Sequence, residues 1–272
     1  MAAMGRLGVG IGWRAEIDLS VERMDGVGFV EVVAENIRPD RLPESLRALR
    51  GRGIPVIPHG VGLGIGGADL PDPAGLAHLA ACAEALDAPL ISEHLAFVRA
   101  GGMEAGHLLP VPRTREVLDI VTENVRRAQA ALPVPFALEN VSAIFGWPED
   151  ELSEAHFLAE LVERTGVGLL VDVANLYTNQ INLGLPAIDA LDVLPLESLA
   201  YVHIAGGHER AGIWHDTHSS TIPDPVLDLL RELCVRVDPP GVLLEWDDNY
   251  PSDTVLTGEL DRIRTTMAKA KR

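Results

Sequence analysis

The pattern of hydrophobic and polar positions alternates between two periods along the chain. Short apolar runs rich in Val, Ile and Leu predict eight strands, over residues 7–13, 28–35, 54–61, 89–97, 135–141, 167–175, 199–206 and 241–248. Segments with helical spacing of apolar residues predict helices over residues 42–53, 73–87, 114–132, 153–166, 188–198, 223–237 and 254–272, with a weaker short helix inside 14–26. Strands that are apolar throughout are typical of parallel sheets covered on both faces. The pattern therefore predicts a parallel sheet with helical crossovers.

Eight alternations of strand and helix in one undivided chain predict an α/β fold, a single (β/α)8 barrel, also called a TIM barrel. The length suits one such domain, which we expect to span residues 1–272. A dinucleotide-binding sheet is disfavoured, because the Gly-rich run GVGLGIGGADLPD at 60–72 leads to proline instead of entering a helix. We interpret this run as a loop at the catalytic face of the barrel.

The composition narrows the possible partners and compartments. The formal net charge of −18, from 40 acidic against 22 basic residues, would repel a phosphate backbone, so we expect no nucleic-acid partner. The sequence contains no apolar run of 18 residues and no signal-peptide pattern, which predicts a soluble, cytoplasmic protein with no membrane association. Cys82 and Cys234 lie in helical patterns and predict buried thiols, not a disulfide framework.

Acidic and imidazole side chains recur at the carboxyl ends of six consecutive predicted strands, which meet at one face of a barrel. The candidate metal ligands are His59, His94, Glu139, Asp172, Asn175, His203, Asp216, His218 and Glu245. Asp216 and His218 stand two apart in the motif H-D-T-H, a spacing that aims both side chains the same way in extended backbone. Each residue alone could have a structural role. Burying so many ionisable groups together, however, is costly unless cations compensate them.

The number and type of these side chains predict a centre with more than one metal ion. Imidazole and carboxylate groups suit Fe, Mn, Zn or Co better than Mg or Ca. One Zn or Fe site needs about three or four protein ligands, fewer than the candidates here, so two or three metals are implied. Glu139 and Glu245 are candidate bridging carboxylates. The lack of thiolate candidates argues against an iron–sulfur cluster.

Six motifs in a fixed order extend over nearly the whole chain, and they carry a family resemblance. The motifs are PHGVGLGIGGADLPD, SEHLAF, LENVS, LLVDVANLYTNQINLG, VHIAGG and HDTHSS. Together they resemble the multinuclear non-haem iron-dependent oxidative enzymes. The resemblance implies a barrel that holds two or three irons in mixed Fe(II)/Fe(III) states and uses dioxygen to modify cysteine residues of a ribosomally made precursor peptide. It also implies a separate protein partner that recognises the leader part of that peptide.

The resemblance also implies a division of the candidate ligands among three irons. The implied sets are His59 with His94 and Glu139; Asp172 with His203 and Glu245, sharing Glu139; and Asn175 with Asp216 and His218. On this hypothesis a substrate thiolate binds iron, and Asp247 and Asp248, beyond the eighth strand, are candidate catalytic residues for proton transfer. Glu31, Glu35 and Glu93 are candidates to fix imidazole tautomers, with salt bridges as the alternative.

Two other classes of protein remain open from the sequence. The first is another divalent-metal TIM barrel, either a sugar isomerase or an endonuclease of the type that cuts at abasic sites. The negative charge disfavours a DNA-cutting enzyme, and the absence of any lysine before Lys269 deprives an isomerase of an ammonium group in its site. The second is a binding protein that sequesters metal for a partner, which would hold metal without consuming dioxygen.

Overall fold

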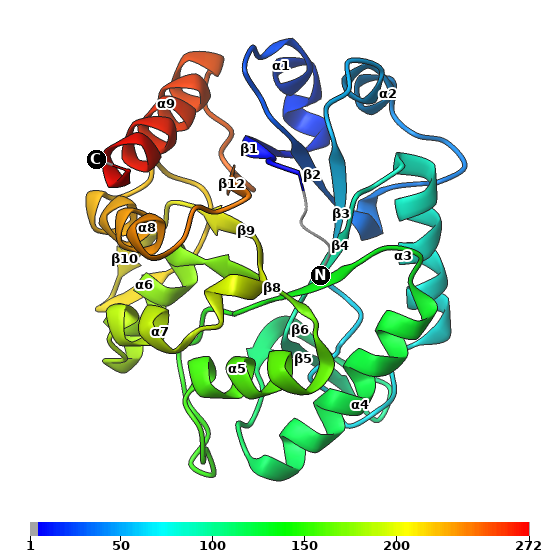
Figure 1. Ribbon diagram of the computed structural model, residues 1–272, viewed down its shortest axis with the longest axis vertical. Coiled ribbons are helices and arrows are strands. Elements are labelled where there is room, and N and C mark those ends of the chain that lie inside the picture. Colours follow the sequence, from blue (N-terminus) through cyan, green and yellow to red (C-terminus); the bar gives the residue numbers. More distant parts are fainter. Residues whose placement is uncertain (1–4, 272) are drawn as a thin grey trace.

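The computed structural model describes residues 5–271, within which eight parallel strands close into a barrel (Figure 1). The strands are β1 (Gly8–Trp13), β2 (Val30–Val33), β3 (Val56–Gly60), β4 (Ile91–His94), β7 (Phe136–Glu139), β8 (Gly168–Asp172), β9 (Leu199–Ile204) and β12 (Gly241–Leu244). Neighbours in this order are paired in parallel, and β12 pairs with β1 to close the sheet. The predicted (β/α)8 barrel is thereby confirmed.

The helices lie outside the strands and surround the barrel (Figure 1). They are α1 (Asp18–Arg23), α2 (Glu44–Gly51), α3 (Pro73–Leu86), α4 (Arg115–Ala131), α5 (Glu154–Thr165), α6 (Val173–Leu183), α7 (Ala187–Val193), α8 (Asp224–Arg236) and α9 (Asp253–Ala270), with 3₁₀ turns η1 (Ala15–Ile17), η2 (Ala34–Asn36) and η3 (Leu196–Ser198). Side-chain oxygens of Asp72, Thr114 and Ser153 accept hydrogen bonds from backbone N–H groups at the starts of α3, α4 and α5. These caps explain why the predicted helices begin where they do.

Two of the predicted ranges include residues outside the described part of the chain. The helix predicted over 254–272 ends at Ala270, and residues 1–4 and 272 of the predicted domain lie outside the described residues. Within residues 5–271, no helix combines the length and the apolar character that a membrane crossing requires.

The strand predicted over 89–97 is shorter in the structure, because a hairpin replaces its end. The hairpin joins β5 (Ala96–Ala100) to the antiparallel β6 (Met103–Pro110), in a region where no strand was predicted beyond residue 97. Gly101 and Gly102 both have positive φ at its turn, a conformation that glycine adopts without steric cost. The apolar run therefore extends into a second sheet instead of continuing one barrel strand.

Two further connections are more ordered than predicted. The strand predicted over 167–175 ends at Asp172, whose side chain accepts hydrogen bonds from the first backbone N–H groups of α6. The carboxylate therefore begins a helix where the strand was predicted to continue to residue 175. In the connection after β9, β10 (His208–Arg210) pairs with β11 (Ile213–His215) as a second small hairpin.

Two layers of side chains fill the barrel interior. In or just before seven strands, an apolar or aromatic residue is followed two positions later by a polar one: Phe29 and Glu31, Ile57 and His59, Leu90 and Ser92, Ala137 and Glu139, Leu170 and Asp172, Tyr201 and His203, and Leu243 and Glu245. Side chains two apart in a strand point to the same face, so both members of each pair face the interior. The first members pack together as one buried cluster. The polar members form the next layer, toward the carboxyl ends of the strands.

Candidate metal centre

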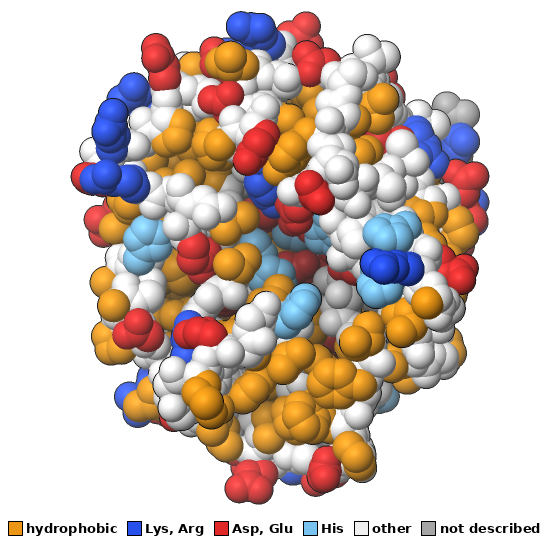
Figure 2. All heavy atoms as spheres, turned by 180° about the vertical axis from the view of Figure 1, so that it is seen from behind, with side chains coloured by type: hydrophobic (Ala, Val, Ile, Leu, Met, Phe, Trp, Pro, Cys, Tyr) orange, Lys and Arg blue, Asp and Glu red, His pale blue; other side chains and the backbone are white. Residues whose placement is uncertain are grey.

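The carboxyl ends of the strands open into a cavity of about 1230 Å³. Figure 2 shows a hollow in this face, with acidic and histidine side chains in its depth and hydrophobic side chains around it. Seven of the nine predicted ligands line the cavity: His59, His94, Glu139, Asn175, Asp216, His218 and Glu245. The other two, Asp172 and His203, are fully buried, and both lie within the same cluster of possible ligands as Glu139 and Glu245. The barrel thus gathers all nine residues in one region.

The strand register places several of these side chains side by side. His94 of β4 is paired with Glu139 of β7, and Asp172 of β8 is paired with His203 of β9. Paired positions of neighbouring parallel strands present their side chains on the same side of the sheet. The register therefore brings together residues that are more than 30 positions apart in the sequence.

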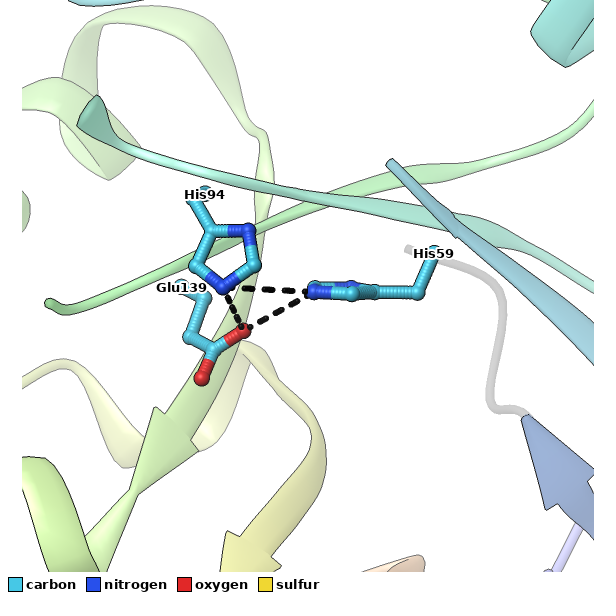
Figure 3. Close-up of side chains that lie close together, drawn as sticks. All are labelled: His59, His94 and Glu139. Carbon is cyan, nitrogen blue, oxygen red and sulfur yellow. Dashed lines mark hydrogen bonds and ion pairs between the residues drawn. The ribbon is translucent and has the colours of Figure 1, made fainter. Parts of the chain in front are cut away.

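His59, His94 and Glu139 form the first strand group, and their side chains converge on one another (Figure 3). His59 Nε2 lies 3.4 Å from His94 Nε2, and Glu139 Oε2 lies 3.3 Å and 3.4 Å from these two nitrogens. Ligands that bind one metal at about 2.1 Å, at angles of about 90° to 109°, are separated by about 3.0–3.4 Å. The three atoms therefore have the spacing that a shared cation requires.

Glu139, Asp172, His203 and Glu245 form the second strand group, in which one ligand atom from each lies within 4.8 Å of the others. His203 Nδ1 is 3.3 Å from Glu139 Oε1 and 3.1 Å from Glu245 Oε2. Glu139 directs Oε2 toward the first strand group and Oε1 toward the second. Its carboxylate lies where a bridge between two cations would be.

Asp216, His218 and Asp247 form the loop group, which lies beyond the ends of β11 and β12. His218 Nε2 is 3.1 Å from Asp216 Oδ2, and His218 Nδ1 is 2.9 Å from Asp247 Oδ2 and 3.5 Å from Glu245 Oε2. Arg14 Nε donates a hydrogen bond of 2.8 Å to Asp247 Oδ1. Asp247, for which the sequence predicted a role in proton transfer, thus lies among residues that could hold a metal.

Several buried polar atoms of the predicted ligands lack a hydrogen-bond partner among the described residues. They are Glu139 Oε2, Asp172 Oδ2, Asn175 Oδ1, Asp216 Oδ1 and His218 Nε2. Buried polar atoms in folded proteins are nearly always hydrogen bonded, and each unsatisfied one costs about 1–3 kcal/mol. Bound cations would compensate these atoms, and a set of nitrogen and oxygen donors without sulfur fits Fe, Mn, Zn or Co.

Hydrogen bonds to neighbouring residues determine which atoms stay unpaired. Asp172 Oδ1 accepts from the backbone N–H groups of Ala174 and Asn175, which leaves Oδ2 as its unpaired oxygen. Asn175 Nδ2 donates to the carbonyl of Asn140 at 2.9 Å, so the amide oxygen of Asn175 is the unpaired one. The side chain of Asn140 in turn bonds both backbone groups of Asp172. These contacts join β7 to the start of α6 and orient two candidate ligands.

Burial and charge together determine where the site holds protons. Burial raises the pKa of Asp172 to about 8, and the negative charge of Asp216 adds to the shift. Burial alone would lower the pKa of His94, but the carboxylates of Glu139, Glu93 and Glu245 together outweigh it and raise the pKa of His94 to about 9. Cations binding at these groups would displace their protons, so metal affinity should increase with pH.

The other residues considered in the sequence occupy varied places. Asp248 accepts a hydrogen bond of 2.7 Å from the backbone N–H of Asn249 and is not among the described residues that line the cavity. Asp247, which lines the cavity, is therefore the better placed of the two candidates for proton transfer. Arg14 and Asn140 were missed by the sequence analysis, because nothing in their spacing distinguishes them from surface or turn residues.

One of the three glutamates considered as imidazole partners makes a hydrogen bond to a candidate ligand ring. Glu31 Oε2 lies 2.8 Å from His203 Nε2. Glu35 accepts hydrogen bonds from backbone N–H groups at 61 and 62, and Glu93 accepts them from backbone N–H groups at 63 and 94. Glu35 therefore holds the backbone after β3, whereas Glu93 contacts the backbone after β3 and in β4 and also lies 3.8 Å from His94 Nδ1.

Sequence comparison relates the chain to a family of peptide-modifying enzymes. The family described as RiPP precursor modification enzyme MbnB/TglH/ChrH matches residues 8–268. A UPF0276 protein of Streptomyces avermitilis is 59% identical over 277 residues, which cover 99% of this chain and 57% of that protein. A UPF0276 protein of Chromobacterium violaceum is 37% identical over 262 residues, covering 96% and 95%. The chain thus spans little more than half of the first relative and nearly all of the second.

Solved structures with a similar fold include enzymes of unrelated chemistry. An L-ribulose 3-epimerase has a TM-score of 0.62 and 16% identity, with 99% of this chain and 96% of that chain covered. Endonuclease IV from Thermus thermophilus has a TM-score of 0.59 and 20% identity, with 96% and 99% covered. At these identities the likeness concerns the barrel fold alone.

Proposed function

Since the chain belongs to the MbnB/TglH/ChrH family of RiPP precursor modification enzymes, we propose that it is an iron- and dioxygen-dependent oxidase. RiPP denotes a ribosomally synthesised and post-translationally modified peptide. The proposed substrate is a precursor peptide of this kind, and the proposed reaction modifies its cysteine residues. The proposed cofactor is a cluster of two or three irons.

The observation that carries this proposal is the group of buried, unpaired donor atoms in and around one cavity. The proposed ligand sets are His59, His94 and Glu139 for one iron; Glu139, Asp172, His203 and Glu245 for a second; and Asn175, Asp216 and His218 for a third, with Asp247 as an additional candidate. The donor types suit iron, although they also suit other borderline divalent metals. The choice of iron rests on the family.

Iron at these positions would supply Lewis acidity and one-electron chemistry with dioxygen. The residues of the chain supply binding and proton transfer. Burial opposes ionisation of Asp247, but the hydrogen bond from His218 and the positive charges of Arg14 and His218 together prevail and lower the pKa of Asp247. A carboxylate that lines the cavity and is ionised at neutral pH can accept the proton of an entering thiol. Arg14 holds this carboxylate in place.

The size and lining of the cavity support a peptide substrate. Its volume of about 1230 Å³ exceeds the roughly 300–1,000 Å³ of common small-molecule sites. Ile144, Phe145 and Ile213 line it and are exposed, so they can contact apolar side chains of a bound segment. We also propose a separate protein that recognises the leader peptide, and a cytoplasmic setting, where thiols stay reduced.

Metal analysis is the first test of this proposal. Protein from iron-supplemented cells, purified without chelators, is compared with a His203→Ala variant by elemental analysis and Mössbauer spectroscopy. We expect about two to three irons per chain with antiferromagnetically coupled signals, and less iron in the variant. Stoichiometric zinc or manganese that persists despite iron supplementation would instead favour a divalent-metal hydrolase or isomerase.

Oxygen uptake is the second test, because metal content alone does not show an oxidase. The iron-loaded protein is mixed with a candidate precursor peptide, and the same peptide with Cys→Ser changes is the matched control. Uptake with the cysteine peptide alone supports the proposal. Stable iron without uptake for any peptide would favour a metal-sequestering protein.

A further inference from the structure

We infer that Glu31 is a positioning residue whose carboxylate sets the tautomers of two histidines, His203 directly and His59 through a buried chain of hydroxyl groups. This inference rests on the proposed metal centre, because it concerns which ring nitrogens are available to bind cations. His59 belongs to the first strand group and His203 to the second. One carboxylate would therefore prepare ligands in both groups.

The direct contact is between Glu31 and His203. Glu31 Oε2 lies 2.8 Å from His203 Nε2, and both side chains are fully buried. An ionised carboxylate only accepts hydrogen bonds, and a neutral imidazole has one N–H. In the neutral form of His203, which is the form that binds a cation, the proton therefore resides on Nε2. The lone pair is left on Nδ1, which is the nitrogen that lies near Glu139 and Glu245.

The chain of hydroxyl groups begins at the same oxygen of Glu31. The hydroxyl of Tyr201 donates its only proton to a hydrogen bond with Glu31 Oε2. Ser92 Oγ lies 2.6 Å from the Tyr201 hydroxyl oxygen, so Ser92 must be the donor in that contact. Ser92 Oγ, having donated, accepts from His59 Nδ1 at 2.8 Å. The proton of His59 is thereby held on Nδ1.

The consequence for His59 is the same as for His203. Its Nε2 keeps the lone pair, and this atom lies 3.3 Å from Glu139 Oε2 and 3.4 Å from His94 Nε2. If the donors and acceptors in this series of hydrogen bonds were exchanged, His59 would carry its proton on Nε2 and could not bind a cation there. The direction is set at one end, where the hydroxyl of Tyr201 donates to Glu31 Oε2.

The residues of this hydrogen-bond network are buried, which strengthens its hydrogen bonds. Glu31, Ser92 and Tyr201 all have 0% exposure, so water does not compete for their hydrogen bonds. Hydrogen bonds are stronger in such surroundings, and a broken one leaves unpaired groups at high cost. Partners of this kind commonly change metal affinity about 10–100-fold when removed. The polar layer of the barrel thus includes residues that prepare ligands as well as the ligands themselves.

The test compares variants that cut the network at different points. Glu31→Met removes the acceptor while keeping the side-chain volume, whereas Glu31→Gln keeps one acceptor oxygen as the conservative variant. Tyr201→Phe and Ser92→Ala interrupt only the branch to His59. Binding of Co(II) to metal-free protein is followed by its visible absorption bands, so the readout is independent of catalytic turnover.

We expect Glu31→Met to weaken two Co(II) binding steps, each about 10–100-fold, and Glu31→Gln to recover most of that loss. Tyr201→Phe and Ser92→Ala should weaken one step only. Glu259→Met is the matched control, because Glu259 is a buried glutamate that instead accepts hydrogen bonds from the backbone N–H of Ile222 and from the guanidinium of Arg262. It should leave every Co(II) step unchanged.

The outcomes separate this inference from the proposed function. Wild-type affinity in Glu31→Met, or an equal loss of both steps in Ser92→Ala, would overturn the inference while leaving a metal enzyme intact. Failure of the wild-type protein to bind Co(II) or iron would overturn the proposed function itself. If Glu31→Met does not fold, the selective effect expected of Tyr201→Phe and Ser92→Ala still decides the matter.

Discussion

The strand groups and the loop group offer similar donor atoms but are built differently. The ligands of the strand groups lie in barrel strands or one residue beyond them, where hydrogen bonds to neighbouring strands fix the backbone. In the loop group, Asp216 and His218 lie in the connection after β11, and Asp247 lies beyond the end of β12. One centre can therefore combine a rigid part with a part whose geometry depends on a few loop contacts.

His203 and His218 illustrate the difference. The side chain of His203 has 0% exposure, whereas that of His218 has 15%. His218 also has a φ of 48°, in the left-handed region that is unfavourable for residues other than glycine. The backbone N–H of Asp247 donates to the carbonyl of His218 at 2.7 Å and helps hold this conformation. We therefore expect the strand groups to bind metal more firmly than the loop group.

The largest effect is expected from Glu139→Ala, which removes a ligand from both strand groups at once. Iron content should fall to about one per chain or less, and oxygen uptake with a cysteine peptide should fall more than about 100-fold, since a ligand matters more than its supporting partners. Elemental analysis and an oxygen electrode measure the two effects. Glu149→Ala, an exposed glutamate outside the cavity lining, is the control. Retention of two irons in Glu139→Ala would remove the bridging role.

A smaller and more selective effect is expected from His218→Ala. The variant should lose about one metal per chain, because the imidazole of His218 lies between Asp216 and Asp247. Among the described residues, it makes no hydrogen bond to His59 or His94. The coupled Mössbauer signal assigned to the strand groups should persist. Loss of all iron in this variant would show that the loop group supports the whole centre and would end the distinction between the groups.

Stepwise metal removal should reveal the same order in the unmodified protein. During dialysis against a chelator, the ion of the loop group is expected to leave first, since loops open more readily than barrel strands. The measurement is residual iron against time, with Mössbauer spectra of the intermediate samples. A single concerted loss of all irons would contradict the prediction.

The smallest effect concerns stability and pH in the metal-free protein. The pKa of His94 is about 9 against an ordinary 6.5, and that of Asp172 is about 8 against 3.8. Between pH 6.5 and 8 the folded state therefore binds more protons than the unfolded state at both groups, so the free energy of unfolding falls as the pH rises. His94 continues this fall up to about pH 9.

Thermal unfolding of chelator-treated protein at several pH values tests this expectation. For a chain of this size, each kcal/mol lost lowers the Tm by about 2–4 °C. Asp172→Asn should show a flatter decline above pH 6.5, since the amide does not titrate. A Tm that is constant or rises over this range would contradict the assigned direction.

Much of the fold could be predicted because two periods in the sequence report directly on local structure. Apolar runs marked the eight barrel strands, and the helical pattern over 114–132 corresponds to α4 almost residue for residue. The predictions failed where one side chain or turn changed the local outcome. Asp172 begins α6 by capping it, and Gly101 with Gly102 turns an apolar run into a hairpin. Neither effect alters hydrophobic periodicity.

By itself, the sequence determined the barrel fold and the end of the barrel at which the polar side chains of its interior lie. A side chain two positions after an interior apolar residue faces the same interior, so His59, Glu139 and Glu245 were recognisable from their own strands. Which of them would meet was decided only by the tertiary structure. The pairing of His94 with Glu139, and the path from Glu31 through Tyr201 and Ser92 to His59, depend on strand register and barrel closure. Periodicity specifies a face, whereas contact across a barrel requires the closed sheet.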